Sequence, residues 1–526
     1  MATLDGPWQR LNSLIPTPAS VAPGSGTTTL PTQPRVTGPT DWVTLACRLL
    51  SATGARPSPD AEANAGAEIT IREADGIGSG AYRLSVSSAA ITLDAADPAG
   101  VIHATQTLLQ LLHPAFAAPA GPPSTSRDLP CCEIEDAPAH SWRGAHVDVA
   151  RHFHPLPWLF TFVDALAAHK FNVLHLHLTD DQGWRFEVTK YPRLTEVGSH
   201  RPGTRYPSWA EHDGIPRGGY YSQAQLRGLV AYAEQRGITI VPEIDVPGHV
   251  RALLAAYPQY GWGEGQPVAT NFDVFPEVLW LDDRAVALVE DIFTELLDVF
   301  PSEVIHIGGD ECPKRQWRDN PDADALAASR GLAGFEQLQR WFTLHLRDWL
   351  AERGRRVIGW DEILNDGDVE DAIVMSWRGT RPGKEALARG YDVVMAPSPL
   401  LYFDSYQSDS PDEPYGREPV RTWADVVAFD PAEGVADEDQ PHLLGVQGQA
   451  WSEFFPTVEH VEYMVWPRLC SLAEVAWRGQ ADPVTFEPRL RAHLERLDAR
   501  AINYRPLDGP HPWQAGGTGA RQREPW

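Results

Sequence analysis

Short apolar runs recur between residues 144 and 447 and are separated by longer stretches of mixed polarity. Runs of this kind, bounded by turn-forming residues, are typical of buried β-strands. We predict eight strands in this region, at residues 144–149, 172–178, 238–244, 303–307, 356–360, 372–377, 391–395 and 443–447. The kind of sheet that these strands form depends on the segments that connect them.

Amphipathic helices are predicted between several of these strands. Apolar residues recur at helical spacing in four sets: Leu159, Phe162, Val163 and Leu166; Leu226, Leu229, Val230 and Ala233; Val286, Val289, Phe293 and Leu296; Phe335, Leu338, Phe342 and Trp349. Ser222 and Gln225 form a capping-box pattern at the start of the second helix, and Gly237 is predicted to end it. About eight strands alternating with helices over roughly 350 residues fit an α/β fold of the (β/α)8 TIM barrel type. An open doubly wound sheet would usually have fewer strands.

The pattern of apolar residues in the first third of the chain differs from the pattern in the predicted barrel. It contains three short strand-like runs, at residues 67–72, 82–86 and 90–94, and then a helical run at residues 99–112. Residues 114–129 are rich in Pro, Ala, Gly and Ser, which is typical of a linker or an exposed loop. We therefore predict a small α+β N-terminal domain with its linker in residues 1–137. The barrel is predicted in residues 138–505 and a C-terminal tail in residues 506–526.

Composition and net charge argue against some classes of function. The 526 residues carry a formal net charge of -27, and the mean hydropathy is -0.31. Such a charge argues against binding to a phosphate backbone, so nucleic acid is not expected as a partner. The sequence contains no run of eighteen apolar residues, so no membrane span is expected either.

The cysteines and the first residues bear on the cellular compartment. The five cysteines are Cys47, Cys131, Cys132, Cys312 and Cys470. They form neither a CxxC metal pattern nor an even disulfide framework, so reduced thiols are expected. Residues 1–7 lack the basic start and the apolar core of a signal peptide. A cytoplasmic protein is therefore the expectation, or a secreted one if the sequence was trimmed; the oligomeric state is left open.

One strand end carries the strongest candidate chemistry. The apolar run 303–307 stops at Gly308 and Gly309 and is followed at once by Asp310 and Glu311. A buried strand that ends in a flexible turn can present ionisable groups at the mouth of a pocket. Adjacent carboxylates repel, so one of them tends to keep its proton near neutral pH and can act as a general acid. A solvated acidic turn is the alternative interpretation of this pair taken alone.

The other strand ends favour the catalytic interpretation, because active sites of (β/α)8 barrels lie at the carboxyl ends of the strands. Acidic, aromatic or basic residues follow almost every predicted strand: Asp148, Arg151, Asp180, Asp181, Glu243, Asp245, His249, Trp360, Asp361, Trp377, Tyr402, Asp404, Trp451 and Glu453. Each tryptophan taken alone is better explained by packing in the core. Three tryptophans together beside carboxylates are instead typical of a sugar-binding site. Sugar C–H faces pack on aromatic rings, and sugar hydroxyl groups need polar partners. A carbohydrate ligand is therefore predicted.

Five segments in a fixed order make this prediction more specific. They are residues 142–153, 170–185, 242–249, 306–311, and the pair 466–469 and 473–477. Together they resemble the β-N-acetylhexosaminidases of glycoside hydrolase family 20, and the resemblance covers nearly the whole chain to about Trp477. It implies an exo-acting, retaining hydrolase of terminal non-reducing β-linked GlcNAc, with GalNAc as a second candidate. The implied partner is an oligosaccharide or glycoconjugate that contains N-acetylhexosamine.

The resemblance also implies a role for each residue at the strand ends. In this family the 2-acetamido group of the substrate replaces an enzyme carboxylate as the nucleophile and forms an oxazolinium intermediate. Glu311 is then the general acid and base, Asp310 orients the acetamide and stabilises positive charge, and Tyr402 hydrogen-bonds the acetamide carbonyl oxygen. The other implied substrate-binding residues are the walls of the -1 subsite (Trp360, Trp377 and Trp451), the partners of ring hydroxyl groups (Arg151, Asp404 and Glu453), and a network near the acid (Asp180, Asp245 and His249).

Two alternatives to this function remain at the level of sequence. His175 and His177 form an HxH pattern on one face of a strand, which could bind metal in a metal-dependent amidohydrolase. Later strand ends carry Trp360 and Trp377 where such an enzyme needs further metal ligands, so no metal and no other cofactor are predicted. The second alternative is a non-catalytic carbohydrate-binding barrel that kept the pocket. The presence of the complete catalytic set argues against it.

Overall fold

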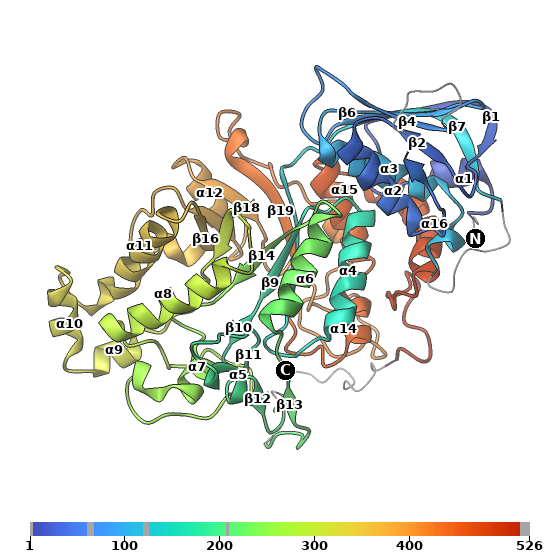
Figure 1. The fold of residues 1–526 in the computed structure, drawn as a ribbon. Helices are drawn as coiled ribbons and strands as arrows, with labels where there is room; N and C mark the ends of the chain where they lie inside the picture. Colours follow the sequence, from blue (N-terminus) through green and yellow to red (C-terminus); the bar gives the residue numbers. More distant parts are fainter. Residues whose placement is uncertain (1–3, 60–67, 119–125, 207–209, 516–526) are drawn as a thin grey trace.

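The fold was analysed in a computed structural model that describes residues 4–59, 68–118, 126–206 and 210–515. An N-terminal sheet with its helices lies beside a closed barrel (Figure 1). Parts of four sequence features fall outside the described residues: the segment 1–7, the predicted strand 67–72, the predicted loop 114–129 and the predicted tail 506–526. Among the described residues, no helix combines the length and the apolar character that crossing a membrane requires.

Eight parallel strands close the barrel, because the last strand, β19, pairs with the first, β8. Their bounds are β8 Trp142–Asp148, β9 Val173–His177, β14 Thr239–Glu243, β15 Val304–His306, β16 Arg356–Trp360, β17 Ile373–Ser376, β18 Asp392–Met395 and β19 Leu443–Ala450. Each of the eight predicted strands overlaps one of these. The predicted (β/α)8 TIM barrel is therefore confirmed.

Helices surround the barrel. The four predicted patterns lie mainly in α4 (Leu156–Ala168), α6 (Gln223–Glu234), α8 (Asp283–Leu297) and α11 (Leu338–Ala351). Phe335 is the exception, since it lies in the preceding 3₁₀ helix η3 (Phe335–Gln337). The capping box of Ser222 and Gln225 is formed. α6 ends just before Gly237, whose φ of 73° suits the reversal of the chain toward β14.

The second half of the barrel is less regular than the first. Between β16 and β17, where residues 361–372 are all described, the short 3₁₀ helix η4 (Asp361–Leu364) takes the place of an α-helix. The later helices are α12 (Arg381–Leu387), α13 (Trp423–Val427), α14 (Val458–Val465), α15 (Arg468–Arg478) and α16 (Pro483–Ala499). Shorter elements lie in the loops: β10 (Thr179–Asp180), β11 (Gly183–Trp184), α5 (Arg193–Glu196), β12 (His200–Arg201), β13 (Arg217–Gly218), α7 (Arg251–Ala256), η2 (Pro258–Tyr260), α9 (Arg315–Asp319), α10 (Ala323–Ser329) and η5 (Gln440–His442).

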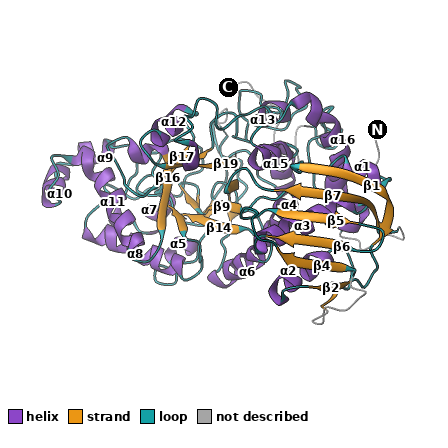
Figure 2. Cartoon of the chain, turned by 90° about the horizontal axis from the view of Figure 1, so that it is seen from above, coloured by secondary structure: helices purple, strands orange, loops and turns teal. Residues whose placement is uncertain are grey.

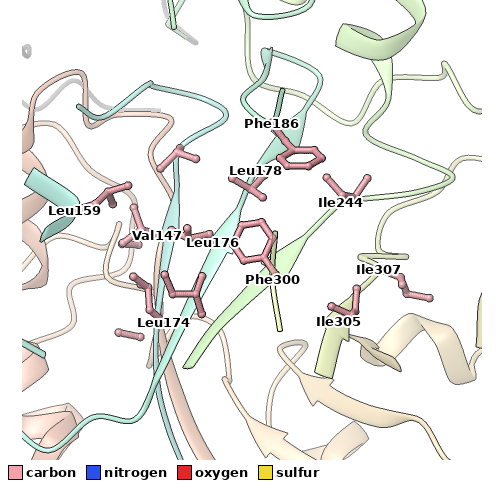
Figure 3. Close-up of a cluster of buried hydrophobic side chains, with 14 of the residues drawn as sticks. Val147, Leu159, Leu174, Leu176, Leu178, Phe186, Ile244, Phe300, Ile305 and Ile307 are labelled. Carbon is pink, nitrogen blue, oxygen red and sulfur yellow. The ribbon is translucent and has the colours of Figure 1, made fainter. Parts of the chain in front are cut away.

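Side chains alternate between the two faces of the barrel strands. The apolar layer between the strands and the helices includes Val147, Leu159, Leu174, Leu176 and Ile305 (Figure 3). His175 and His177, which alternate with these leucines on β9, point to the barrel interior and contact Glu243. Because successive side chains of a strand point to opposite faces, the outer face supplies the hydrophobic core and the inner face is free for polar residues.

The N-terminal sheet has seven strands and is larger than predicted. Its order is β1-β7-β5-β6-β4-β2-β3, part of which is seen in Figure 2. The bounds are β1 Ser20–Thr29, β2 Arg35–Thr37, β3 Ser58–Pro59, β4 Ile69–Glu73, β5 Tyr82–Val86, β6 Ile91–Ala95 and β7 Asp128–Asp136. β4, β5 and β6 correspond to the three predicted strands. β7 begins inside the segment predicted as a linker, because pairing with both β1 and β5 holds it extended.

The helices of the N-terminal part connect it to the barrel. They are α1 (Pro7–Leu11), α2 (Thr40–Ser51), α3 (Pro98–Leu111) and the 3₁₀ helix η1 (Pro114–Ala117). α3 matches the predicted helix 99–112, and it contacts α4 of the barrel. Trp477 of α15 packs inside the hydrophobic core of the N-terminal sheet. The two parts therefore share one buried interface.

Candidate active site

The turn after β15 depends on two glycines. Gly308 and Gly309 have φ values of 67° and 95°, which favour glycine. A Cβ atom on Gly308 would lie 1.9 Å from Oδ1 of Asp245, so a side chain there would displace that carboxyl group. The amide of Gly309 donates a hydrogen bond to the same oxygen at 3.0 Å. The turn thus brings Asp310 and Glu311 to the carboxyl end of the barrel, as predicted.

The two adjacent carboxyl groups have different surroundings. The side chain of Asp310 is 14% exposed and that of Glu311 is 39% exposed. Burial raises the pKa of Asp310. The pKa of Glu311 is lowered, first by its interaction with His249. Burial thus disfavours the charged form of Asp310, whereas His249 favours that of Glu311. Which of the two keeps its proton stays a prediction.

His249 lies between Glu311 and a pair of buried carboxylates. Its Nε2 atom lies 3.6 Å from Oε2 of Glu311 and 3.8 Å from Oδ2 of Asp310. Its Nδ1 atom lies 3.1 Å from Oδ2 of Asp181 and 3.4 Å from Oδ1 of Asp180. Burial lowers the pKa of His249, but the neighbouring carboxylates, first Asp180, outweigh burial and place that pKa well above its usual value. His249 is therefore a cation beside Glu311 near neutral pH.

Arg151, which follows β8, is fixed on several sides. Its Nη2 atom lies 2.8 Å from Oδ2 of Asp180, and its Nε atom donates to Oε1 of Gln182 at 3.1 Å. The guanidinium carbon lies 5.0 Å from the ring centroid of Trp451. A planar cation held in this way can present its remaining donors to a ligand in one orientation.

Beneath these groups, Glu243 is shared by several donors in the barrel interior. Its carboxylate lies 2.5 Å from Nδ1 of His177, 3.0 Å from Nε2 of His175 and 3.1 Å from Nδ1 of His306. The indole nitrogen of Trp360 donates to it at 2.9 Å. These histidines and acids are close enough to hold a metal ion. Their contacts with one another also account for the HxH pattern, so the expectation of no metal stays a prediction.

The predicted aromatic residues form one cluster. The ring centroids of Trp360 and Trp451 are 5.6 Å apart, and those of Tyr402 and Trp451 are 6.2 Å apart. Trp377 and Tyr402 stack with an interplanar angle of 21° and a centroid distance of 6.0 Å. Trp360 is only 1% exposed, whereas Trp377 is partly exposed. Trp360 is thus the floor of the cluster, and Trp377 lies closer to its rim.

Asp404 and Glu453 add two buried carboxyl groups to the same end of the barrel. Nη1 of Arg417 lies 3.3 Å from Oδ2 of Asp404. Burial raises the pKa of Asp404 and raises that of Glu453 to about 7. Oδ1 of Asp404 and Oε2 of Glu453 have no hydrogen-bond partner among the residues that the structure describes. Because buried polar atoms are rarely unpaired, these two oxygens are suited to accept hydrogen bonds from a polar ligand.

A cavity of about 260 Å³ opens beside these groups. It is lined by Arg151, Gln182, His249, Phe272, Asp273, Val274, Glu311, Arg417, Glu453 and Phe454. The predicted residues Asp310, Tyr402, Trp360, Trp377, Trp451, Asp180, Asp245 and Asp404 do not line it but lie in the network or the aromatic cluster around it. Sequence reasoning missed Gln182, Arg417, Phe454 and residues 272–274. Gln182 and Phe454 directly follow predicted strand-end residues, Asp181 and Glu453, whereas Arg417 and residues 272–274 lie on loops without a periodic pattern.

A larger cavity, of about 530 Å³, lies between the N-terminal helices and the helices α4 and α16. None of the predicted site residues lines it. By volume alone, this cavity would be the stronger candidate for a ligand site. The barrel mouth, however, combines paired acids, a cation and aromatic rings at the carboxyl ends of parallel strands. The barrel mouth is therefore the candidate active site.

Known proteins resemble both parts of the chain. Residues 140–480 match the catalytic domain of glycosyl hydrolase family 20, and residues 12–137 match domain 2 of that family. The β-hexosaminidase of Porphyromonas gingivalis is 37% identical over 451 residues, which are 83% of this chain and 56% of that protein. The β-hexosaminidase of Vibrio furnissii is 33% identical over 77% of this chain and 67% of its own length.

Solved structures agree with this match. The N-acetyl-β-hexosaminidase of Streptomyces plicatus, in complex with thio-NAglucal, has a TM-score of 0.81 and 29% identity over 97% of this chain and 98% of that chain. An exo-β-N-acetylglucosaminidase from Vibrio harveyi, in complex with N-acetylglucosamine, has a TM-score of 0.83 and 28% identity over 96% of this chain and 79% of its own. With its barrel and its N-terminal sheet both matched, the chain belongs to glycosyl hydrolase family 20.

Proposed function

We propose that this chain is an exo-acting, retaining β-N-acetylhexosaminidase that removes terminal non-reducing β-linked GlcNAc through an oxazolinium intermediate. The observation that carries the proposal is that the adjacent carboxyl groups of Asp310 and Glu311 have different surroundings. Asp310 is enclosed, while Glu311 is half-exposed at the rim of the cavity beside His249. The names of the relatives support the activity, and the chain spans only 56% of the Porphyromonas gingivalis protein.

The first step uses the acetamide of the substrate. Its carbonyl oxygen attacks C1 of the same sugar and forms a C1–O bond while the glycosidic C1–O bond breaks. The leaving oxygen takes a proton from Glu311, so the aglycone departs as a neutral alcohol. Nε2 of His249 lies 3.6 Å from Oε2 of Glu311, so the two side chains together can hold the proton that Glu311 delivers. Asp310 faces the positive charge that develops on the oxazolinium ring.

The second step restores the enzyme and the sugar. Glu311, now a carboxylate, removes a proton from water, and the water oxygen attacks C1. The C1–O bond to the acetamide oxygen breaks, the oxazolinium ring opens, and the acetamide is regenerated. Two successive inversions at C1 leave the β configuration of the product unchanged.

The remaining residues bind the sugar. Tyr402 hydrogen-bonds the acetamide oxygen. Trp360, Trp377 and Trp451 wall the -1 subsite, with Trp377 beside Tyr402 enclosing the acetamide. Arg151, Asp404 and Glu453 bind the ring hydroxyl groups. The unpaired oxygens of Asp404 and Glu453 support this assignment. How these two carboxyl groups meet O4 decides whether GalNAc is accepted beside GlcNAc.

Rates with paired p-nitrophenyl β-GlcNAc and β-GalNAc, and then with chito-oligosaccharides, test the proposal. Asp310→Asn should lower turnover of these acetamido substrates by about 10²–10³-fold, because a group that stabilises transition-state charge is lost. Near-normal turnover of a folded Asp310→Asn protein would overturn the mechanism. Activity that survives a chelator would separate this function from a metal-dependent amidohydrolase.

A further inference from the structure

The 3₁₀ helix η4 follows β16 directly and packs against the turn that carries Asp310. A Cβ atom on Gly309 would lie 3.0 Å from Cγ2 of Ile363 in this helix. Glu362, the residue before Ile363, is 10% exposed at its side chain. An acid from an element outside the predicted catalytic set is thus enclosed next to the catalytic turn.

Two consecutive acids of η4 hold two consecutive residues after β17. Asp361 accepts hydrogen bonds from the backbone amides of Trp377, at 2.9 Å, and Arg378, at 3.1 Å. Glu362 accepts a hydrogen bond from the indole nitrogen of Trp377 at 2.8 Å. Oε1 of Glu362 lies 3.7 Å from Nε of Arg378. Asp361 therefore fixes the backbone of Trp377, and Glu362 fixes the rotation of its ring.

The ring that Glu362 holds stacks on Tyr402 with an interplanar angle of 21°. In the proposed function, Tyr402 binds the acetamide oxygen and Trp377 encloses the same group. A rotation of the indole would change the width of the space between the two rings. Since the acetamide is the nucleophile, its position sets the rate of the first step.

We infer that Glu362 is a positioning residue for the acetamide: it holds the indole of Trp377 parallel to Tyr402 by accepting one hydrogen bond. This inference rests on the proposed function, because Trp377 contacts the acetamide only if the substrate is an N-acetylhexosamine. Glu362 touches no reacting atom and acts through Trp377.

The charges around Glu362 indicate whether its side chain is protonated when it accepts the hydrogen bond from Trp377. Burial, and next the charges of Asp310 and Asp361, raise the pKa of Glu362 to about 8. The hydrogen bond from Trp377 and the charge of Arg378 lower this pKa, but they oppose the shift only partly. Glu362 is therefore neutral near pH 7 and accepts the hydrogen bond without adding a negative charge beside Asp310. A glutamine, which is also a neutral acceptor, should replace it.

The test compares Glu362→Ala, Glu362→Gln, Trp377→Phe and the double variant Glu362→Ala/Trp377→Phe. One readout is kcat/KM with p-nitrophenyl β-GlcNAc, and the other is the affinity for GlcNAc and for glucosamine by calorimetry. Glu362→Ala should lose at least about tenfold in kcat/KM and in GlcNAc affinity, with glucosamine affinity unchanged, while Glu362→Gln stays within about threefold of the parent. In the Trp377→Phe background, which lacks the N–H donor, Glu362→Ala should add nothing.

Glu370→Ala is the matched control, because this exposed acid lies in the same connection between β16 and β17. It should leave both readouts unchanged. The inference fails if Glu362→Ala stays within twofold of the parent, if Glu362→Gln is as impaired as Glu362→Ala, or if the Glu362 and Trp377 effects are additive. If Glu362→Ala does not fold, Trp377→Phe, which lacks the N–H donor, should still lose at least about tenfold in kcat/KM, while Glu362→Gln should stay within about threefold of the parent. An inactive parent that binds GlcNAc would defeat the proposed function, while the calorimetric comparison would still decide the role of Glu362.

Discussion

Two groups of buried charged residues in this molecule differ in how completely they are paired. The first lies at the interface between the N-terminal sheet and the barrel. There, Asp136 accepts hydrogen bonds from Nζ of Lys170 at 2.7 Å, from the hydroxyl of Tyr82 at 2.8 Å and from the indole of Trp477 at 2.8 Å. The ammonium of Lys170 also lies 4.4 Å from the ring centroid of Trp477. Each charge in this interface group therefore has its partners within the protein.

The second group lies at the barrel mouth. Oδ1 of Asp404 and Oε2 of Glu453 are buried without a hydrogen-bond partner in the described part of the chain. Burial raises the pKa of both carboxyl groups, which means that their charged forms are poorly stabilised by the protein. No atom of Asp136, Lys170, Tyr82 or Trp477 is unpaired in this way among the described residues. A complete network stabilises the fold, whereas an incomplete one is suited to bind a ligand.

The largest expected effect at the barrel mouth comes from the proton donor. Glu311→Gln removes the transferable proton and should lower kcat by about 10²–10⁴-fold, equivalent to roughly 3–5 kcal/mol. Steady-state kinetics with p-nitrophenyl β-GlcNAc measure this change. The control is Glu303→Gln, at the exposed other end of the same segment, which should stay within about twofold of the parent. A Glu311→Gln protein as active as the parent would remove the assignment of the acid.

At the interface, the largest expected effect is on stability. Lys170→Met removes the ion-pair partner of the buried Asp136, which should lower the free energy of unfolding by about 3–5 kcal/mol. Denaturant unfolding measures this loss, and the folded fraction should keep the parental kcat. Lys190→Met is the control, because Lys190 is 58% exposed and pairs with Asp291 at the surface, so it should change stability by at most about 1 kcal/mol. Equal losses for both variants would show that burial of the interface group is unimportant.

A smaller effect is expected for a single ligand-binding carboxyl group. Asp404→Asn removes the charge that pairs with Arg417 at 3.3 Å, and because Arg417 is 47% exposed, this should cost at most about 1 kcal/mol of stability. It should lower kcat/KM by about 10–100-fold, because a hydrogen bond from a sugar hydroxyl to a charged acceptor is lost. The ratio of rates with GlcNAc and GalNAc glycosides should change as well. The exposed Asp412 lies on the same loop, and Asp412→Asn should leave this ratio unchanged.

The smallest expected effect is a pH dependence of stability. The pKa of Glu453 is raised from 4.5 to about 7, so between these pH values the folded protein binds a proton that the unfolded chain has released. Its contribution to stability is therefore favourable at low pH and is lost as the pH rises toward 7. Glu453→Gln removes this loss. Relative to the parent, the variant should gain roughly 1–2 kcal/mol of stability between pH 5 and pH 8.

Urea unfolding of both proteins at several pH values measures this gain. A difference that does not change with pH would show that Glu453 is ionised in the folded state throughout this range. Such a result would also weaken the contrast between the two buried groups, since Glu453 would then be as well stabilised as Asp136.

The barrel was predictable from local patterns, but much of the N-terminal sheet was not. Barrel strands are buried on both faces and therefore appear as apolar runs. β1, by contrast, has the sequence SVAPGSGTTT and is almost entirely exposed, and among the described strands it pairs only with β7. Such an edge strand carries neither an apolar run nor a clear alternation. η4 was missed for a related reason, since a single 3₁₀ turn is too short for helical periodicity.

The candidate site was predictable wherever a residue directly follows a strand. Asp310, Glu311, Arg151 and Glu453 could be selected by this rule because a parallel barrel gathers all its carboxyl ends on one side. Arg417 and Phe272 lie in the middle of loops, and their approach to the cavity depends on how those loops fold back. The role inferred for Glu362 is of the same kind, because its hydrogen bond crosses from one strand connection to the next.

The sequence by itself determined the barrel, the residues at the ends of its strands and the family, because these follow from periodicity and from the order of short motifs. Only the tertiary structure decided which of two adjacent acids is enclosed and which lies beside His249. It also decided which buried charges are fully paired and which are not. The physical reason is that a pKa and a hydrogen-bond partner depend on distances between groups far apart in the chain, as between Glu311 and His249 or between Asp136 and Lys170.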